Sequence, residues 1–295
     1  MTADIQKKVV DKILEALDSG VAPWQKGWTL NGFLPMNYVS KKPYKGINFF
    51  MCMANNFTSP YYLSKKQIND AGGSIIKGCK GTLITYWTMF KKIEKDANGQ
   101  DKERLIPYLQ LTHVWNEEQI SGIEFKHPEK GSIFSYNEEA DRIIDAMPNK
   151  PMIKEAINDK AYYSPTFDYI ALPSRAQYAD LNKFYSTLNH ELIHSTGHKS
   201  RVGRAGIENF DYKGSHQYAF EELIAELGAC MLNSISGVNS PSLTENNAAY
   251  IKHWRDKIAS DNKLIFKAAT EAQKAVDYIL GVTKESAEVA EKESA

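Results

Sequence analysis

The stretch NKFYSTLNHELIHSTGHKSR, residues 182–201, decides the fold of the second half of this 295-residue chain. Its apolar residues recur at spacings of three and four, which predicts an amphipathic helix over residues 183–195. The residues expected on the buried face of this helix are Leu181, Phe184, Tyr185, Leu188 and Leu192. A helix of this kind fixes the relative directions of the polar side chains on its other positions.

The pentapeptide HELIH within this helix is typical of a catalytic metal site. His190 and His194 lie one helical turn apart, so both imidazole rings can point to one ion. Glu191 follows the first histidine, where it can act as the general base toward a water molecule activated by the metal. Gly197 comes directly after the helix and is expected to end it in the left-handed conformation.

A catalytic metal site needs a third protein ligand, and the segment YAFEELIAELGACML supplies two candidates on a second predicted helix. Glu222 and Glu226 lie one turn apart, so one can bind the metal while the other holds a ligand histidine. By analogy with gluzincin-like enzymes, in which the first acid is the ligand, Glu222 is favoured. Ala225 and Ala229 beside them predict close packing on the HELIH helix. We expect one Zn²⁺ per chain, with another divalent transition metal such as Mn²⁺ as the alternative.

Other polar residues near this site are less informative. Glu221 is expected to point away from the metal as a surface charge. A further hydrogen-bond donor to the transition state could come from several residues, and the sequence singles out none of them: Tyr185, Tyr212, Tyr218 and His216.

The formal net charge of the chain is zero, but the charge is unevenly distributed. Between Gly20 and Lys95, eleven lysines are opposed only by Asp70 and Glu94. Residues 131–295 instead carry 23 acidic against 18 basic side chains. This asymmetry predicts a basic module followed by a chemically different one.

Aromatic residues are interleaved with the lysines of this basic module. Rings that stack on bases, together with cations that contact phosphates, are typical of single-stranded DNA binding, with an affinity that falls steeply as salt rises. The stretch from Trp24 to Tyr62 has no arginine, which argues against reading of base edges. The residues that we expect to contact DNA are Trp24, Lys41, Lys42, Tyr44, Lys45 and Lys80.

Periodicity and turn residues divide the chain into two expected domains and a tail, with an α+β fold overall. The front domain, residues 1–128, is expected to contain helices at 5–20 and 64–71 and strands at 81–93 and 105–116, with loops over 21–50. The second domain, residues 133–283, is expected to be mainly helical, with a helix at 137–146 and strands near 161–163 and 169–172. Residues 284–295 are expected to form a solvated tail.

Composition excludes several classes of protein. No run of eighteen apolar residues occurs, so we expect no membrane span, and the start lacks a signal-peptide core. Cys52, Cys79 and Cys230 are odd in number and far apart, which fits a reducing, cytoplasmic environment.

Several long motifs resemble the ArdC antirestriction family. In the front half they are GVAPWQKGW, PMNYVSKKPYKGIN, LSKKQINDAGGSIIKGCKGTLITYW and HVWNEEQI. In the second half they are SPTFDYIALP, FYSTLNHELIHSTGHKSRVGR, YAFEELIAELGACML and NNAAYIKHWRDKIASDNKLIFKAATEAQKAVDYIL. The usual phrase of the family differs mildly at Trp115-Asn116 and Glu118-Gln119. The resemblance implies a plasmid-borne protein that acts around conjugation and blunts host restriction. It also implies single-stranded DNA binding by the front domain and a zincin-like, SprT-like metallopeptidase fold in the second.

The sequence therefore favours an enzyme, a zinc-dependent metallopeptidase tethered to single-stranded DNA, whose protein substrate is unidentified and could lie on the same strand. The alternative is a non-enzymatic DNA shield in which the metal only stabilises the fold. A structural zinc site would have four protein ligands, whereas this sequence offers three and a base. A metal-dependent nuclease would need an oxygen-rich carboxylate cluster, which HELIH does not supply.

Overall fold

A computed structural model describes most of the chain, namely residues 2–20, 22–24, 34–55, 57–95, 101–127, 136–157, 159–178, 180–208, 216–238 and 248–282. The expected domain boundary between 128 and 133, the expected tail and Tyr212 lie outside these described residues. Within them, no helix combines the length and the apolar composition that a bilayer span requires.

The front half is built on a four-stranded sheet of order β1-β2-β5-β4, in which only β1 and β2 run parallel. Its elements in chain order are α1 (Thr2–Asp18), β1 (Met36–Asn37), α2 (Ile47–Met53), β2 (Tyr61–Ser64), α3 (Lys65–Asp70), β3 (Ser74–Ile75), β4 (Thr82–Lys95), β5 (Asp101–Asn116), a 3₁₀ turn at Glu117–Gln119 and β6 (Ile120–Ser121). The strands β3 and β6 form a separate antiparallel pair.

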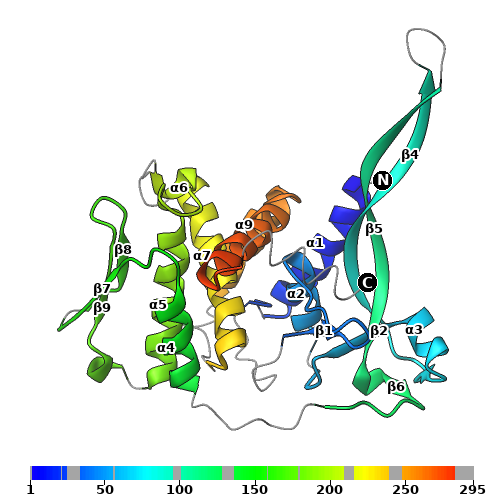
Figure 1. Ribbon diagram of the computed structural model, residues 1–295, viewed down its shortest axis with the longest axis horizontal. Helices are drawn as coiled ribbons and strands as arrows, with labels where there is room; N and C mark the ends of the chain where they lie inside the picture. The colour runs from blue at the N-terminus through cyan, green and yellow to red at the C-terminus, as the bar shows by residue number, and fades with distance from the viewer. Residues whose placement is uncertain are drawn as a thin grey trace.

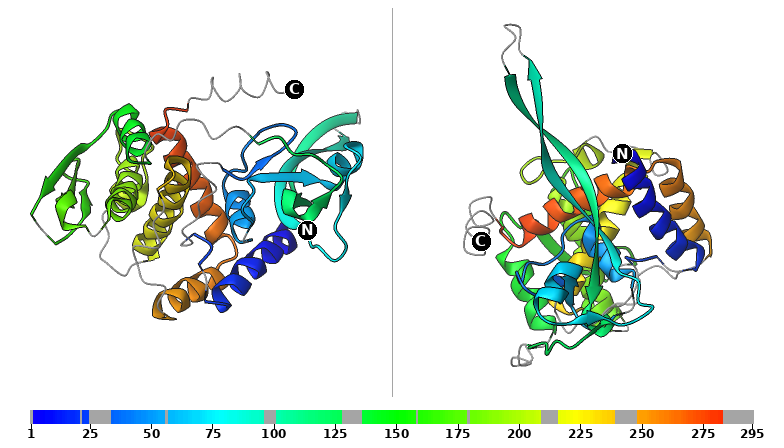
Figure 2. Two further views of the ribbon diagram at one scale, coloured as in Figure 1. Left: turned by 90° about the horizontal axis from the view of Figure 1, so that it is seen from below. Right: turned by 90° about the vertical axis from the view of Figure 1, so that its right-hand side faces the viewer.

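The hairpin of β4 and β5 is the most extended part of the molecule. The two strands pair antiparallel without interruption from Thr82 opposite Val114 to Lys95 opposite Asp101. The outer part of the hairpin projects well beyond the rest of the protein (Figures 1 and 2). Both strands continue further than the sequence predicts, because charged residues expected in the turn take part in the ladder.

The local sequence correctly predicts one helix of the front half, but it did not reveal another. The expected helix near 64–71 is present as α3. The Ser64 side chain accepts a hydrogen bond from the Gln67 amide, and the Gln67 side chain accepts one from the Ser64 amide, which forms a capping box. The first part of the segment INFFMCM was expected to be loop, but the whole segment forms α2, whose residues are almost all buried. A segment of seven residues with one polar position, Asn48, is too short to show an amphipathic period, so periodicity could not identify this helix.

The second half is mainly helical. Its elements are α4 (Tyr136–Ala146), β7 (Met152–Ala156), β8 (Tyr162–Ser164), β9 (Tyr169–Pro173), a 3₁₀ turn at Arg175–Gln177, α5 (Leu181–Thr196), α6 (Ala205–Glu208), α7 (His216–Ser236), α8 (Ala248–Ser260) and α9 (Leu264–Ile279). The three strands form a small sheet of order β7-β9-β8 at one end of the molecule (Figure 1). The expected mixed architecture, a front region with a sheet and a helical second region, is confirmed, and β7 was not expected.

The two regions share one hydrophobic core. Helix α1 packs against α8 and α2 packs against α9, as the view from below shows for α1 and α8 (Figure 2). One continuous cluster of buried side chains runs from Val9 on α1 to Ile279 on α9. At its edge, Lys45 pairs with Asp277 at 3.3 Å, and the Gly46 amide donates to the Gln273 side chain at 3.0 Å. The front helices are therefore part of the same core as the C-terminal helices.

Candidate metal centre

The site lies between α5 and α7, which pack closely in the helical region. Asp180 caps the start of α5 by accepting a hydrogen bond from the Asn182 amide at 2.6 Å. Gly228 on α7 faces Ile193 on α5, and a Cβ at position 228 would lie only 2.6 Å from the Ile193 side chain. Close packing was expected from Ala225 and Ala229, which are also buried, and Gly228 is a further small residue at which the helices approach each other. This approach brings polar side chains of both helices together.

The end of α5 differs from the prediction. Gly197 follows the last helical residue with φ −70°, so it is right-handed and does not use the left-handed conformation expected of it. It is required for another reason, because a Cβ there would lie 2.5 Å from Ile207. The segment around Ile207 therefore packs directly against the end of α5.

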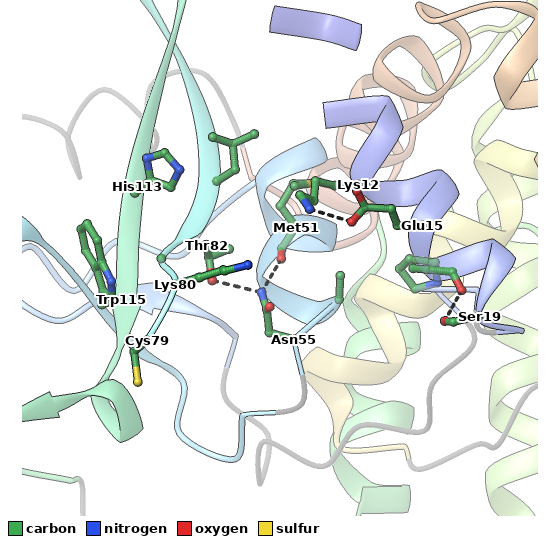
Figure 3. Close-up of a pocket in the computed structure, with 15 residues that line it drawn as sticks. Lys12, Glu15, Ser19, Met51, Asn55, Cys79, Lys80, Thr82, His113 and Trp115 are labelled. Atoms are coloured by element: carbon green, nitrogen blue, oxygen red, sulfur yellow. Dashed lines mark hydrogen bonds and ion pairs between the residues drawn. The ribbon is translucent and has the colours of Figure 1, made fainter. Parts of the chain in front are cut away.

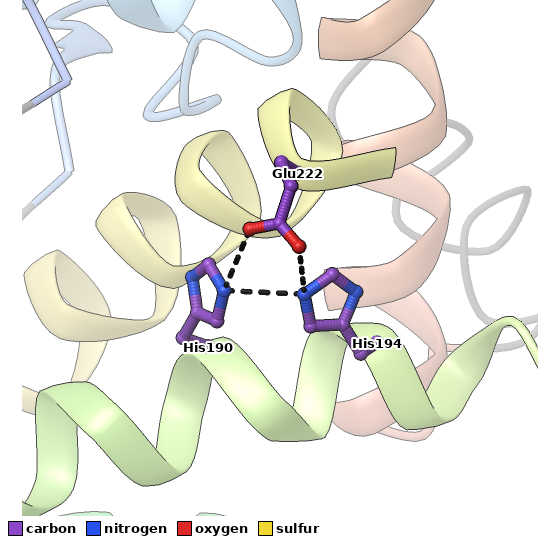
Figure 4. A group of neighbouring side chains, drawn as sticks. All are labelled: His190, His194 and Glu222. Atoms are coloured by element: carbon purple, nitrogen blue, oxygen red, sulfur yellow. Dashed lines mark hydrogen bonds and ion pairs between the residues drawn. The ribbon is translucent and has the colours of Figure 1, made fainter. Parts of the chain in front are cut away.

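Two histidines and one glutamate converge between the helices, and we refer to them as the ligand triad (Figure 4). The Nε2 atoms of His190 and His194 are 3.1 Å apart. The two carboxylate oxygens of Glu222 lie 3.5 Å from His190 Nε2 and 3.6 Å from His194 Nε2. Ligand atoms held at about 2.0–2.1 Å in a tetrahedral zinc site lie about 3.3 Å from one another. The spacing and the donor types of the triad therefore fit one such ion.

The electrostatics of the triad suit a cation. Burial acts to raise the pKa of Glu222, but its hydrogen bond to His190 and the nearby imidazoles lower it to about 2. Burial acts to lower the pKa of His190, whereas Glu222 and the charges of Glu191 and Glu226 raise it to about 9. Glu222 is thus held ionised, the state in which a carboxylate binds a metal.

A buried ion pair lies next to the Nδ1 side of the His194 ring, away from the triad. The Nδ1 atom of His194 lies 3.3 Å from a carboxylate oxygen of Glu221. Arg204 donates to both oxygens of that carboxylate, at 2.6 Å and 3.0 Å, and also to the Thr196 hydroxyl and the Ile193 carbonyl. Burial acts to raise the pKa of Glu221, but the bonds from His194 and Arg204 keep it below its usual value. This carboxylate orients the ring of a triad histidine.

The prediction for Glu221 is therefore wrong. Glu221 is only 4 % exposed, rather than a surface charge, and it takes the histidine-holding position that was expected of whichever glutamate was not the ligand. Glu226 does not belong to the triad. Arg204 was missed altogether, because a single arginine after the helix has no periodic or motif signal.

Glu191 lies beside the triad and is 8 % exposed. Two tyrosines are close enough to sense its charge, since Glu191 contributes to the raised pKa values of Tyr178 and Tyr218 after burial. The Tyr218 hydroxyl also bonds to the Glu222 carboxylate. Of the donors left open by the sequence, the structure describes the side chains of Tyr218, which lies at the triad, and Tyr185, which is a core residue bonded to Arg175 at 3.2 Å.

The six residues expected to contact DNA occupy different environments. Trp24 is 4 % exposed within the shared core, and Tyr44 is partly buried against the small cluster around Tyr62, so both rings pack within the protein. Burial raises the pKa of the Tyr44 hydroxyl. Lys45 pairs with Asp277, as described above. All three side chains therefore take part in contacts within the protein.

The remaining three of the six are cations at the surface or in a cavity. Lys41 lies over the rings of Tyr38 and Tyr61, at 3.6 Å and 4.6 Å from their centroids, and Lys42 is exposed. Lys80 lines a cavity of about 920 Å³ between α1, α2 and the base of the hairpin (Figure 3). The six residues therefore do not combine exposed rings and cations on one surface.

Comparison with known protein families divides the chain in the same way as its fold. The model of a family described as the N-terminal domain of anti-restriction factor ArdC matches residues 3–115. The model of a family described as zincin-like metallopeptidase matches residues 138–271, which include the triad.

Two curated relatives are much longer than this chain. Each is a DNA primase TraC of Escherichia coli, and they are 35% and 34% identical to it over 289 and 292 residues. These matches cover 92% and 93% of this chain but only 19% and 27% of the primases, so the chain spans about a fifth to a quarter of their length.

Solved structures of similar length match nearly the whole chain. The metal-free crystal structure of the antirestriction protein ArdC from plasmid R388 is 32% identical, with a TM-score of 0.74, and the match covers 94% of this chain and 96% of that one. The Mn(II)-bound structure of the same protein is 30% identical, with a TM-score of 0.70 and coverage of 94% and 97%. The chain therefore belongs to the ArdC antirestriction family.

Proposed function

We propose that this protein binds single-stranded DNA and hydrolyses peptide bonds at a metal ion held by His190, His194 and Glu222, and that it protects incoming DNA from host restriction. The observation that carries the enzymatic part is the convergence of the triad with Glu191 beside it. The zincin-like family match and the Mn(II)-bound relative support a divalent metal at this position.

The proposed reaction divides between the metal and the side chains of this chain. When bound, the ion would supply Lewis-acid activation of water and of the scissile carbonyl. Glu191 takes the proton of the attacking water and then delivers it to the leaving amine nitrogen. Tyr218 donates a hydrogen bond to Glu222 and so fixes the carboxylate, while Glu221 fixes the His194 ring from the opposite side.

The proposed DNA binding gives the peptidase its targets. A chain that holds a DNA strand through its basic front half meets other proteins on that strand at a high effective concentration. We therefore propose proteins bound to the same single strand as substrates.

We expect cleavage to depend on both the metal and the DNA. The test incubates the purified chain with basic DNA-binding proteins, with and without a single-stranded oligonucleotide, and follows fragments by gel electrophoresis and mass spectrometry. Cleavage should stop after treatment with a chelator, return when Zn²⁺ or Mn²⁺ is added, and be faster when the oligonucleotide carries both proteins. No cleavage by a fully metallated, DNA-bound chain would contradict the proposed activity.

The two candidate glutamates give a matched pair of variants. Glu222→Ala should weaken metal binding by at least about 100-fold, which exceeds the effect of removing an outer partner. Glu226→Ala should leave the affinity close to that of the unaltered chain, because Glu226 is not in the triad. Titration against a competing chelator measures both affinities. If Glu226→Ala had the larger effect, the proposed ligand set would be wrong.

A further inference from the structure

The outer part of the β4–β5 hairpin, residues 86–95 and 101–110, forms an arm that projects from the protein (Figures 1 and 2). A two-stranded ribbon on its own is at best marginally stable in water. This arm nevertheless exposes a concentration of large apolar side chains, namely Tyr86, Trp87, Met89, Phe90, Ile93 and Leu105. Such a concentration of exposed apolar side chains marks an interaction surface.

The two faces of the arm differ in chemistry. Side chains alternate along each strand, and directly paired residues share a face. We call one the aromatic face; it carries Tyr86, Thr88, Phe90, Lys92 and Glu94 from β4 and Gln110, Tyr108, Ile106, Arg104 and Lys102 from β5. The opposite face carries Trp87, Met89, Lys91 and Ile93 from β4 and Leu109, Pro107, Leu105 and Glu103 from β5.

The rings of the aromatic face are arranged as a ladder. Tyr86 and Phe90 lie two rungs apart on β4, and Tyr108 lies on the rung between them, opposite Thr88. Successive rungs on one face are about 6.8 Å apart, because they are two residues apart along a strand. This is twice the 3.4 Å rise per nucleotide of a stacked DNA strand, which leaves room for one base on each ring. The ladder therefore matches a splayed single strand.

Hydrogen bonds and ring contacts hold the ladder in place. The Tyr86 hydroxyl donates to the Gln110 side-chain oxygen, and the Gln110 amide nitrogen donates to the Tyr108 hydroxyl. The Phe90 and Tyr108 rings meet edge to face, with centroids 6.3 Å apart. Rings fixed in this way lose little further freedom when a base stacks on them.

The charge of the aromatic face complements phosphate. On the rung beyond Phe90, Lys92 lies directly opposite Arg104. On the next rung outward the same face carries Glu94 opposite Lys102, so its cations outnumber its carboxylates. On the opposite face the charges are balanced, because Lys91 pairs with Glu103 at 3.1 Å and Lys95 lies opposite Asp101. The cations that lie next to the rings therefore favour a polyanion on the aromatic face.

We infer that the aromatic face of the arm is a single-stranded DNA-binding surface, on which Tyr86, Tyr108 and Phe90 stack against bases while Lys92 and Arg104 contact phosphates. This inference rests on the proposed DNA binding and assigns it to residues outside the lysine-rich loops that the sequence favoured. The opposite face, with its apolar residues and its internal ion pair, lacks this combination.

Matched variants on the two faces test the assignment in the full-length protein. Tyr86→Ala combined with Phe90→Ala should weaken binding of a labelled single-stranded oligonucleotide by about 30-fold or more, since stacking on each ring contributes substantially. Lys92→Gln combined with Arg104→Gln should reduce the slope of log affinity against log salt by about 1.4, or about 0.7 for each phosphate contact. The control, Trp87→Ala combined with Met89→Ala, should stay within about twofold. Fluorescence anisotropy at several salt concentrations measures all three.

The outcomes separate the inference from the function on which it rests. If the unaltered chain binds single-stranded DNA and the aromatic-face variants bind it equally well, the arm is not the binding surface and the proposed function stands. If the unaltered chain does not bind single-stranded DNA, the proposed binding itself fails. If the control variant alone loses binding and changes its mass in solution, the arm is a protein contact and the inference is overturned. Photocrosslinking of a halogenated oligonucleotide to peptides of β4 or β5 would support the inference directly.

Discussion

Glu191→Gln should reduce peptide cleavage by about 10²- to 10⁴-fold, the usual contribution of a positioned general base. Glutamine keeps the size and hydrogen bonding of the side chain but cannot accept the proton of the attacking water. Because Glu191 is not in the triad, metal content and thermal stability should remain close to those of the unaltered chain. Single-turnover cleavage at a fixed metal content measures the effect, and DNA binding provides a second readout that should not change.

The same substitution also separates two explanations of antirestriction. Glu226→Gln is the matched control, because it removes a carboxylate from the facing helix without altering the triad. If incoming DNA loses protection in the Glu191→Gln variant alone, proteolysis is the mechanism. If protection persists although the variant is fully metallated and inactive, the protein acts as a shield on DNA and the peptidase serves another purpose. Cleavage that survives in Glu191→Gln would contradict the assigned base.

Arg204→Met should destabilise the protein by about 3–5 kcal/mol, the range found when one partner of a buried ion pair is removed. Arg204 and Glu221 are 6 % and 4 % exposed, so the remaining carboxylate would have neither its counter-charge nor water. Its bond to His194 would also lose its anchor, and metal affinity should fall by about 10- to 100-fold. Urea unfolding of the metal-free protein measures the first effect, and competitive metal titration measures the second.

Arg201 provides a control three residues away. Its side chain is fully buried, binds both carboxylate oxygens of Asp168 at 2.8 Å and 2.9 Å, and donates to the Ser195 carbonyl at 3.1 Å, whereas Asp168 is 35 % exposed and is not in the triad. Arg201→Met should therefore reduce stability without reducing metal affinity. The double change Arg204→Met with Glu221→Gln should recover part of the stability but not the affinity. Equal metal affinities in the two arginine variants would show that Arg204 does not position His194.

The sequence predicted those parts of the site that helix geometry alone determines. The spacing of His190 and His194 places both rings on one side of any helix, and Glu222 was favoured over Glu226 by analogy with gluzincin-like sites. Glu221 could not be assigned in this way. Neighbouring residues on a helix point about 100° apart, so Glu221 cannot face the metal site in the same way as Glu222. Glu221 is buried because Arg204, which lies in a separate loop, pairs with its carboxylate.

A similar limit applies to the front half. The strands of the hairpin were predicted from their alternating residues, but alternation does not reveal whether a face is covered. Trp87 is 64 % exposed although its surroundings in the sequence resemble a buried strand. Covering depends on which helices reach the sheet, and α2 covers only its inner part, for example through Asn48, whose side chain bonds to the backbone of Thr85.

The shared core of α1, α2, α8 and α9 bears on how these proteins exchange parts. Each half contributes side chains that the other half keeps away from water, so neither could be recombined alone without exposing a large apolar surface. The segment that can be exchanged between larger polypeptides is then the two halves together. The two long primases fit this view, since each contains a counterpart of more than nine-tenths of this chain. A substitution in the core of one half would therefore favour compensating substitutions in the other half.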